Sequence, residues 1–359
     1  MKITNTIISG TGSYIPTEKV ANSAFLSQDF YDEKQQKINS SGEEIIRKFE
    51  KITGIKERRY IKDDMKTSDT AAIAAKRAID DAGIDPESID QIILAHNYGD
   101  VQAKSLHSDM VPSLASRVKS ILGIENPNCV AYDILFGCPG WIQGVIQAHS
   151  YIKSGMGNRF LVIGAESLSR VNDKYDRDSM IYADGAGATI VEGIQSNKKK
   201  GFLSASMRTD TKNEAYYLFS GKSNNPEVNP KYRYIKMHGR KIYEYALSNV
   251  PQAMELALER SGSKIENLKK IFIHQANEKM DEAMVNRFYR LYKKGNMIPE
   301  NIMPMSIHGL GNSSVATIPT LFDGVRKGVY KNQELFENDL LIFASVGAGM
   351  NINSFVYRY

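Results

Sequence analysis

The chain has 359 residues, of which 42% are hydrophobic and 24% charged, and its formal net charge is +5. This length allows one large domain or two halves that share a core, and the composition is typical of a globular protein. A charge this small argues against nucleic acid as a partner, and no apolar run approaches the ~20 residues of a membrane helix. The N-terminal residues lack a signal-peptide core, so we expect a cytoplasmic protein.

Strand-like and helix-like segments alternate from the N-terminus onward. Residues 7–10 predict a strand that runs into a glycine turn, and the polar residues 21–60 predict mainly helix. A helix over 67–82 and a strand over 91–95 follow, and this alternation favours parallel strands covered by helices. The turn at Gly10-Thr11-Gly12 lacks the third glycine and the following helix of a dinucleotide fingerprint, so we expect no nucleotide cofactor there.

The stretch around Cys138 has the pattern of a nucleophile site. An apolar run over 130–136 ends at Gly137, and the residues after Cys138 predict a helix that ends near Gly155. Unpaired N–H groups and the dipole favour an anion at a helix start, so we expect the Cys138 thiolate to be stabilised. A free cysteine is equally a common buried core residue, and this stretch alone leaves both interpretations open. The spacing to Cys129 suits neither a zinc site nor a disulfide framework.

The second part of the chain repeats the layout of the first. Three pairs of residues keep a constant offset of 179 positions: Gly83 and Gly262, Ile89 and Leu268, Ile92 and Ile271. Gly311-Asn312 precedes a predicted helix and then a strand, as Gly137-Cys138 does. The repetition favours an internal duplication over chance similarity of such units. We therefore expect two related halves, residues 1–194 and 195–359.

This duplication predicts that three polar residues meet. Ligands bind beyond the carboxyl ends of parallel strands, where Cys138 and Asn312 would lie at equivalent helix starts. His274 directly follows a predicted strand and would face the same crevice. A late glycine turn over 346–350 offers backbone N–H groups for an oxyanion. Cys138, His274 and Asn312 are therefore the candidate catalytic residues.

Three blocks of sequence resemble the signature blocks of β-ketoacyl-ACP synthase III, a family of the thiolase superfamily. They are Gly137-Cys138-Pro139-Gly140-Trp141, His274-Gln275-Ala276-Asn277 and Gly311-Asn312-Ser313-Ser314-Val315-Ala316. The resemblance runs nearly end to end and includes residues 10–16, 53–58 and 183–188. It implies an α/β protein with the duplicated five-layer αβαβα thiolase fold, two mixed sheets and a homodimer. It implies neither a metal nor a cofactor.

The resemblance also assigns roles to the candidate residues. Cys138 would be the nucleophile that is acylated. His274 and Asn312 would hydrogen-bond the thioester carbonyl of the second substrate and stabilise the enolate formed when a malonyl group loses carbon dioxide. The N–H groups of Cys138 and Ala348 would form the oxyanion hole. The implied activity is that of a Claisen-condensing acyltransferase that uses thioesters of acyl carrier protein or coenzyme A.

Departures from the family pattern concern the carrier of the acyl group. Lys48 and Ile52 stand in the region where the family often has a tryptophan and an arginine that hold the adenine of coenzyme A. Free coenzyme A should therefore bind weakly, and we expect substrates to arrive mainly on acyl carrier protein. The resemblance gives a set of substrate-binding or carrier-binding residues: Arg177, Gly239, Arg240, Asn277 and Lys279.

Other departures suggest a specialised relative. Val111 stands where housekeeping members have a phenylalanine that limits the acyl pocket across the dimer. Segments 96–110 and 206–230 are extended, either by drift or to reshape the pocket for longer acyl chains. One alternative is a ketosynthase of the dialkylresorcinol and flexirubin type, which joins a 3-oxoacyl chain to a second acyl thioester and closes a ring, with His274 as base.

Two further alternatives are a non-catalytic partner subunit with the thiolase fold and a Cys-His-Asn hydrolase. The presence of all three polar residues argues against the partner subunit. The near end-to-end resemblance argues against the hydrolase.

Overall fold

The first of two mixed β-sheets contains most strands of the N-terminal half. The computed structural model describes residues 3–105 and 107–359. The strand order is β1 (Ile3–Tyr14), β7 (Asp184–Ser196), β6 (Arg159–Ser167), β4 (Gln91–Ala95) and β5 (Val130–Ile134). β4 is parallel to both β5 and β6, whereas β7 is antiparallel to β1 and β6.

The second sheet repeats this arrangement. Its order is β8 (Gly201–Thr209), β13 (Asn351–Arg358), β12 (Leu340–Gly347) and β11 (Leu268–Ile273), with β11 parallel to β12 and β13 antiparallel to both neighbours. The Ile271 N–H donates to the Ile302 carbonyl at 2.8 Å, so residue 302 lies beside β11 as β5 lies beside β4. The predicted duplication is confirmed in strand order and direction. The predicted boundary at residues 194 and 195 falls within β7 and stays a prediction.

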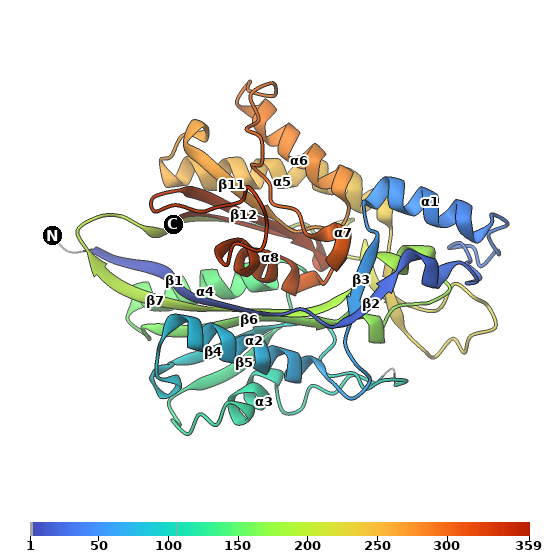
Figure 1. The fold of residues 1–359 in the computed structure, drawn as a ribbon, viewed down its shortest axis with the longest axis horizontal. Coiled ribbons are helices and arrows are strands. Elements are labelled where there is room, and N and C mark those ends of the chain that lie inside the picture. Colours follow the sequence, from blue (N-terminus) through green and yellow to red (C-terminus); the bar gives the residue numbers. More distant parts are fainter. Residues whose placement is uncertain (1–2, 106) are drawn as a thin grey trace.

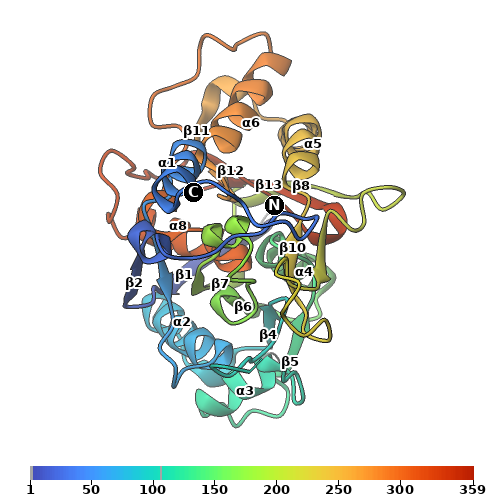
Figure 2. The same ribbon diagram turned by 90° about the vertical axis from the view of Figure 1, so that its right-hand side faces the viewer.

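Helices cover both sheets and fill the space between them, which gives five layers (Figure 1). α2 (Thr67–Ala82) and α3 (Leu114–Ile121) lie outside the first sheet, and α5 (Gly239–Ser261) and α6 (Glu278–Leu291) lie outside the second. α4 (Gly140–Ser154) and α8 (Thr317–Arg326) form the middle layer. Figure 2 shows the same order from the side, with α5 and α6 at one end and α2 and α3 at the other. The predicted αβαβα architecture is confirmed.

The core between the two sheets contains a cluster of large aromatic side chains. Phe272, Phe343 and Phe355 stack with ring centroids 4.9 Å and 4.5 Å apart, and Trp141 of α4 packs against Phe343 at 6.0 Å. Such aromatic pairs add to the free energy of burial because their rings prefer these offset contacts. Both sheets contribute to this cluster, so the two halves share one core.

The turn predicted at Gly10-Thr11-Gly12 is not formed, because these residues lie within β1 and pair with β7, and the two glycines have a packing role instead. A Cβ at Gly12 would lie 2.3 Å from the Ala74 carbonyl, and one at Gly10 would lie 2.4 Å from the Ala78 carbonyl. Real side chains do not approach a backbone that closely, so these glycines let α2 pack directly on β1.

The region 21–60 differs from its prediction, because only part of it is helical. β2 (Glu18–Ala21) and β3 (Glu57–Tyr60) pair as antiparallel strands, and α1 spans Gly42–Thr53. Ser41 caps the start of α1 by accepting from the Glu44 N–H at 3.2 Å, and Gly54 ends the helix with φ 75°. Local polarity does not reveal a strand pair whose members are separated by a helix.

Short elements complete the chain. They are α7 (Ile307–Leu310), the 3₁₀ helices Asn22–Phe25, Pro86–Ser88, Leu168–Arg170, Arg177–Ile181, Ile265–Asn267, Ser314–Ala316 and Ala348–Met350, and the paired strands β9 (Leu218–Gly221) and β10 (Tyr234–Met237). No helix in the described part of the chain is both long and apolar enough to cross a membrane.

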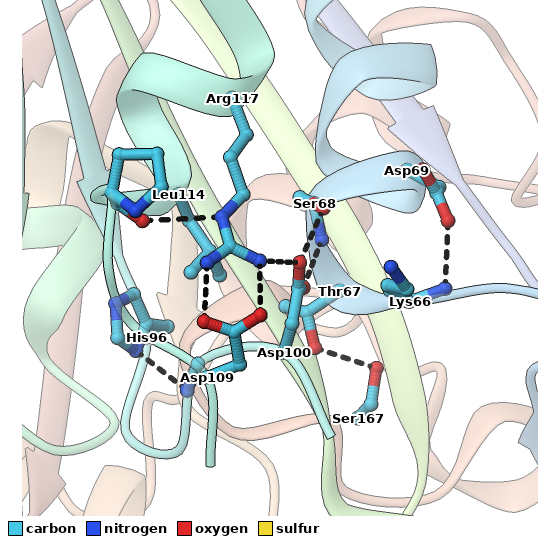
Figure 3. A network of polar contacts seen from close by, with 12 residues as sticks. Lys66, Thr67, Ser68, Asp69, His96, Asp100, Asp109, Leu114, Arg117 and Ser167 are labelled. Atoms are coloured by element: carbon cyan, nitrogen blue, oxygen red, sulfur yellow. Dashed lines mark hydrogen bonds and ion pairs between the residues drawn. The ribbon is translucent and has the colours of Figure 1, made fainter. Parts of the chain in front are cut away.

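The first extended segment is held by ion pairs and the second by hydrogen bonds to a buried ion pair. In the first, Asp100 accepts from the Ser68 N–H and hydroxyl at 2.8 and 2.6 Å, and Arg117 joins Asp100 to Asp109 (Figure 3). In the second, buried Lys236 contacts Asp173 at 2.6 Å and Asn224 at 2.8 Å. Both segments are therefore tied to the body of the protein.

Candidate active site

Cys138 lies in a tight turn between β5 and α4. Gly137 has φ 65°, and its carbonyl accepts from the Gly140 N–H at 3.0 Å. A Cβ at Gly137 would lie 2.5 Å from the Ala348 nitrogen, so a glycine is needed both for conformation and for space. The predicted sequence of strand, glycine, cysteine and helix is confirmed, with α4 beginning at Gly140.

The balance of effects on the Cys138 thiol differs from the prediction. Its pKa is raised to about 11, mainly by burial; the hydrogen bond from Ser314 opposes this rise, and the charge of Glu166 contributes to it. The Ser314 Oγ lies 3.4 Å from the Cys138 Sγ. Burial thus opposes the thiolate that the helix start was predicted to favour, and the thiol is mainly protonated at neutral pH.

His274 directly follows β11 and is almost completely buried. Its backbone N–H donates to the Ala344 carbonyl of β12 at 2.9 Å. Burial lowers the pKa of the ring to about 4, so the imidazole is neutral at pH 7 and can donate one hydrogen bond. Gln275 fixes this strand end, because its side-chain oxygen accepts from the Ser306 and Ile307 N–H groups at 2.9 and 3.1 Å.

Asn312 is buried and its amide has a fixed orientation. Its Oδ1 accepts from the Ser314 N–H at 2.8 Å, which leaves its Nδ2 to donate toward the site. Its backbone pairs with residues 181–183, through the Ile181 carbonyl at 2.9 Å and the Ala183 N–H at 2.8 Å. Gly311 before it has φ 67°, where a Cβ would lie 2.8 Å from the Arg58 Cβ.

The backbone N–H groups of Cys138 and Ala348 come from two turns in close contact. A Cβ at Gly347 would lie 2.3 Å from the Cys138 nitrogen, so only glycine allows the end of β12 to approach this turn. The Ala348 carbonyl accepts from the Asn351 side chain at 2.8 Å, which fixes the orientation of the second turn. Two amides held in this way can serve a developing oxyanion.

A mostly apolar cavity of about 430 Å³ opens beside these residues. Four of the predicted binding residues contribute to its wall: Arg177, Gly239, Arg240 and Asn277. Lys279 is exposed on α6 and Val111 is 87% exposed, and neither lines the cavity. Cys138, His274 and Asn312 are not part of the described lining, which reaches their neighbours Ile181 and Ala276.

The sequence reasoning missed three polar residues beside Cys138. Ser314 contacts the sulfur, Asn97 contacts Ser314, and the fully buried Glu166 contacts Asn97. A signal was present, since Asn97 is a polar residue two positions after the end of β4, and Ser314 lies in the Asn312 block. The described residues contain no cluster of three or more His, Cys, Asp or Glu side chains suited to a metal ion.

Comparisons with known proteins agree with this geometry. The family 3-oxoacyl-[acyl-carrier-protein] synthase III matches residues 132–211, and its C-terminal region matches residues 258–359. The chain is 32% identical to β-ketoacyl-[acyl-carrier-protein] synthase III of Neisseria meningitidis serogroup C and 30% identical to that of Cereibacter sphaeroides, over 98% of each chain. The crystal structure of 3-oxoacyl-[acyl-carrier-protein] synthase III from Aquifex aeolicus VF5 superposes with a TM-score of 0.78 and 30% identity, covering 99% of this chain and 100% of that one.

The fold and the similarities define an acyl-transferring condensing enzyme of the thiolase superfamily. Within that class, the chain belongs to the β-ketoacyl-[acyl-carrier-protein] synthase III family. The alternative of a non-catalytic partner subunit is thereby set aside.

Proposed function

We propose that Cys138 carries the acyl group during catalysis. Its sulfur attacks the carbonyl carbon of an acyl thioester, the bond to the carrier sulfur breaks, and the released carrier thiol takes the proton of Cys138. The N–H groups of Cys138 and Ala348 hold the negative oxygen of the tetrahedral intermediate. The close contact between the Gly137 and Gly347 turns supports this assignment, because it brings the two backbone amides near each other.

His274 and Asn312 act on the second substrate. They donate hydrogen bonds to the thioester oxygen of a malonyl group, whose bond to its carboxylate breaks to release carbon dioxide and leave an enolate. The enolate carbon attacks the acyl carbon on Cys138, and the Cys138 thiolate leaves. The observation that carries this role is the neutral state of both donors in a buried site, since His274 has a pKa of about 4. Two neutral donors stabilise an enolate oxygen without giving it a proton too early.

The thioester arm of acyl carrier protein is proposed to enter through the apolar cavity. Arg177 and Arg240 lie in its wall, and Arg240 is 91% exposed in an ion pair with Glu244. Lys279 adds an exposed cation at the start of α6. These cations suit the phosphate of the arm and the acidic surface of a carrier, while Gly239 and Asn277 line the path.

Intact-mass spectrometry tests the acylation step. Purified protein is mixed separately with acetyl-, octanoyl-, malonyl- and 3-oxooctanoyl-carrier protein, together with Cys138→Ala and with Cys129→Ala as the matched control. We expect a mass gain that Cys138→Ala abolishes and Cys129→Ala keeps, because Cys129 is buried in the outer core. Acylation of Cys138→Ala would contradict the assignment.

The same experiment distinguishes between the two proposed second substrates. Carbon dioxide release with malonyl-carrier protein supports the decarboxylating reaction. A product that forms only with a 3-oxoacyl partner identifies the ring-forming dialkylresorcinol or flexirubin type instead.

We further propose a cytoplasmic homodimer. β5 forms one edge of its sheet and pairs only with β4, while Val130 and Leu135 at its ends are 54% and 62% exposed. Val111 nearby is 87% exposed, as expected if a second copy covers it. Both cysteines are free, which suits a reducing compartment.

Analytical ultracentrifugation tests the dimer. Val130→Lys should yield monomers, because a charge would be buried at the edge. Met297→Lys, at an equally exposed position in the other half, should remain dimeric. Dimers that persist in Val130→Lys would contradict this interface.

A further inference from the structure

Ser314 links the two halves of the site through a single residue. Its hydroxyl lies 3.4 Å from the Cys138 sulfur, and its backbone N–H orients the Asn312 amide at 2.8 Å. We propose that Ser314 is a further catalytic residue that activates Cys138, and that Asn97 and Glu166 are positioning residues that aim its hydroxyl. This inference rests on the proposed role of Cys138 as the nucleophile.

The direction of the hydrogen bonds follows from the donors available. The Asn97 Nδ2 carries two hydrogens, and it contacts the Glu166 Oε2 at 2.5 Å and the Ser314 Oγ at 3.2 Å. Both hydrogens are thereby used, and the Ser314 oxygen acts as an acceptor toward Asn97. The single hydrogen of Ser314 is then left for the Cys138 sulfur.

The backbone of Ser314 is held in an uncommon conformation. Its φ is 53°, in the left-handed region that residues other than glycine seldom adopt, and the residue is only 4% exposed. Such strain persists only where the surroundings impose it, and it is concentrated at functional sites. Here it allows the N–H to reach Asn312 while the hydroxyl reaches Cys138.

The positioning residues are fixed from outside the site. Ser167, next to Glu166, accepts from the Thr67 hydroxyl at 2.9 Å, and Asp100, close to Asn97 in sequence, accepts from Ser68 at the start of α2 (Figure 3). The ends of β4 and β6 therefore have little freedom to move. A hydroxyl aimed by such a rigid frame costs little reorganisation when a thiolate forms.

The chemical need for this hydroxyl comes from burial. Desolvation opposes the thiolate of Cys138, both when it attacks the thioester and when it leaves after condensation. A hydroxyl that donates to sulfur stabilises the thiolate more than the thiol. Ser314 thereby offsets part of the free-energy cost of forming a thiolate in a buried site.

Alkylation of Cys138 by iodoacetamide as a function of pH tests the proposal without any substrate. The modified Cys138 peptide is quantified by mass spectrometry in the wild type, Ser314→Ala, Asn97→Ala and the matched control Ser313→Ala. Ser313 is buried, and its hydroxyl faces Thr317 at 3.4 Å. We expect Ser314→Ala to raise the apparent pKa of the thiol by about one unit and to slow alkylation at pH 8 about tenfold.

The other variants complete the test. Asn97→Ala should raise the apparent pKa of the thiol less than Ser314→Ala does, because the Ser314 hydroxyl remains and only its orientation is lost. If Ser314→Ala fails to fold, Asn97→Ala alone still tests the proposal. Ser313→Ala should leave the profile unchanged. Profiles of Ser314→Ala and Asn97→Ala that coincide with the wild type would overturn the proposal, while an acylated Cys138 in the carrier-protein experiment would still support the proposed function.

Discussion

The two halves of the protein share one topology but supply different chemistry to the site. The N-terminal half contributes groups that can change charge: the Cys138 thiol, with a pKa of about 11, and the Glu166 carboxyl, whose pKa burial raises to about 7. The C-terminal half contributes groups that stay neutral at pH 7: the Asn312 amide and the His274 ring, with a pKa of about 4. The two halves thus share one geometry, and under the proposed mechanism the N-terminal half takes up the acyl group while the C-terminal half stabilises the enolate.

Removing the neutral donors gives the sharpest test of this division. His274→Ala and Asn312→Ala should each reduce condensation about 10²- to 10³-fold, because each removes one donor from the enolate oxygen. Acylation of Cys138 should remain nearly unchanged, since its proposed oxyanion donors are the backbone N–H groups of Cys138 and Ala348 and not these two side chains. Condensation is followed by product mass and acylation by intact protein mass, with the exposed His107→Ala as control. An equal loss of both steps would contradict the division.

The contact between the two turns is tested at Gly347. A Cβ there would lie 2.3 Å from the Cys138 nitrogen, so Gly347→Ala must displace one of the two backbone amides. We expect acylation to slow about 10²-fold, as when one donor to an oxyanion is lost. Gly309→Ala is a suitable control, because the nearest atom to its Cβ would be Glu57 Oε1 at 3.9 Å. Acylation of Gly347→Ala at the wild-type rate would argue against the assigned oxyanion hole.

The neutrality of His274 predicts a pH dependence of stability. Its pKa is about 4 in the folded protein and about 6.5 when unfolded, so the unfolded chain binds more protons between these values. Stability should therefore fall as the pH is lowered from 6.5 towards 4, and at pH 4.5 this group costs about 2.5 kcal/mol relative to pH 7. In denaturant titrations, the free energy of unfolding of His274→Gln should fall by about that much less than that of the wild type between pH 7 and pH 4.5. The pKa of His149 is also about 4, and its contribution cancels in this comparison.

Glu166→Gln gives the smallest expected effect. It separates the effect of the Glu166 charge on Cys138 from the role of Glu166 in positioning Asn97. Glutamine keeps an acceptor for Asn97 but removes the carboxylate charge, which raises the pKa of Cys138. Alkylation of the thiol should therefore become about two- to threefold faster above pH 7, where Glu166 is ionised, and unchanged below pH 6. Slower alkylation across the whole pH range would mean that the hydrogen bond to Asn97 needs the carboxylate itself.

Several elements could be predicted because their signals are local. The turn at Gly137 and the end of α2 at Gly83 each have a glycine stop, the strand before His274 has an apolar run, and the structure has all three. The helix predicted within region 21–60 is present as α1, but β3 was missed, because β2 and β3 pair across that helix and neither strand shows its partner in the local pattern.

The sequence by itself determined the order of strands and helices, their duplication and the identity of the three candidate catalytic residues, because these follow from periodicity and from residue type. Only the tertiary structure decided the protonation of Cys138, since burial is a sum over many distant neighbours and is the main cause of the raised pKa of the thiol. It also decided the grouping of Ser314 with Asn97, Glu166 and Cys138, which lie far apart in sequence and meet where two sheets end around a shared middle layer.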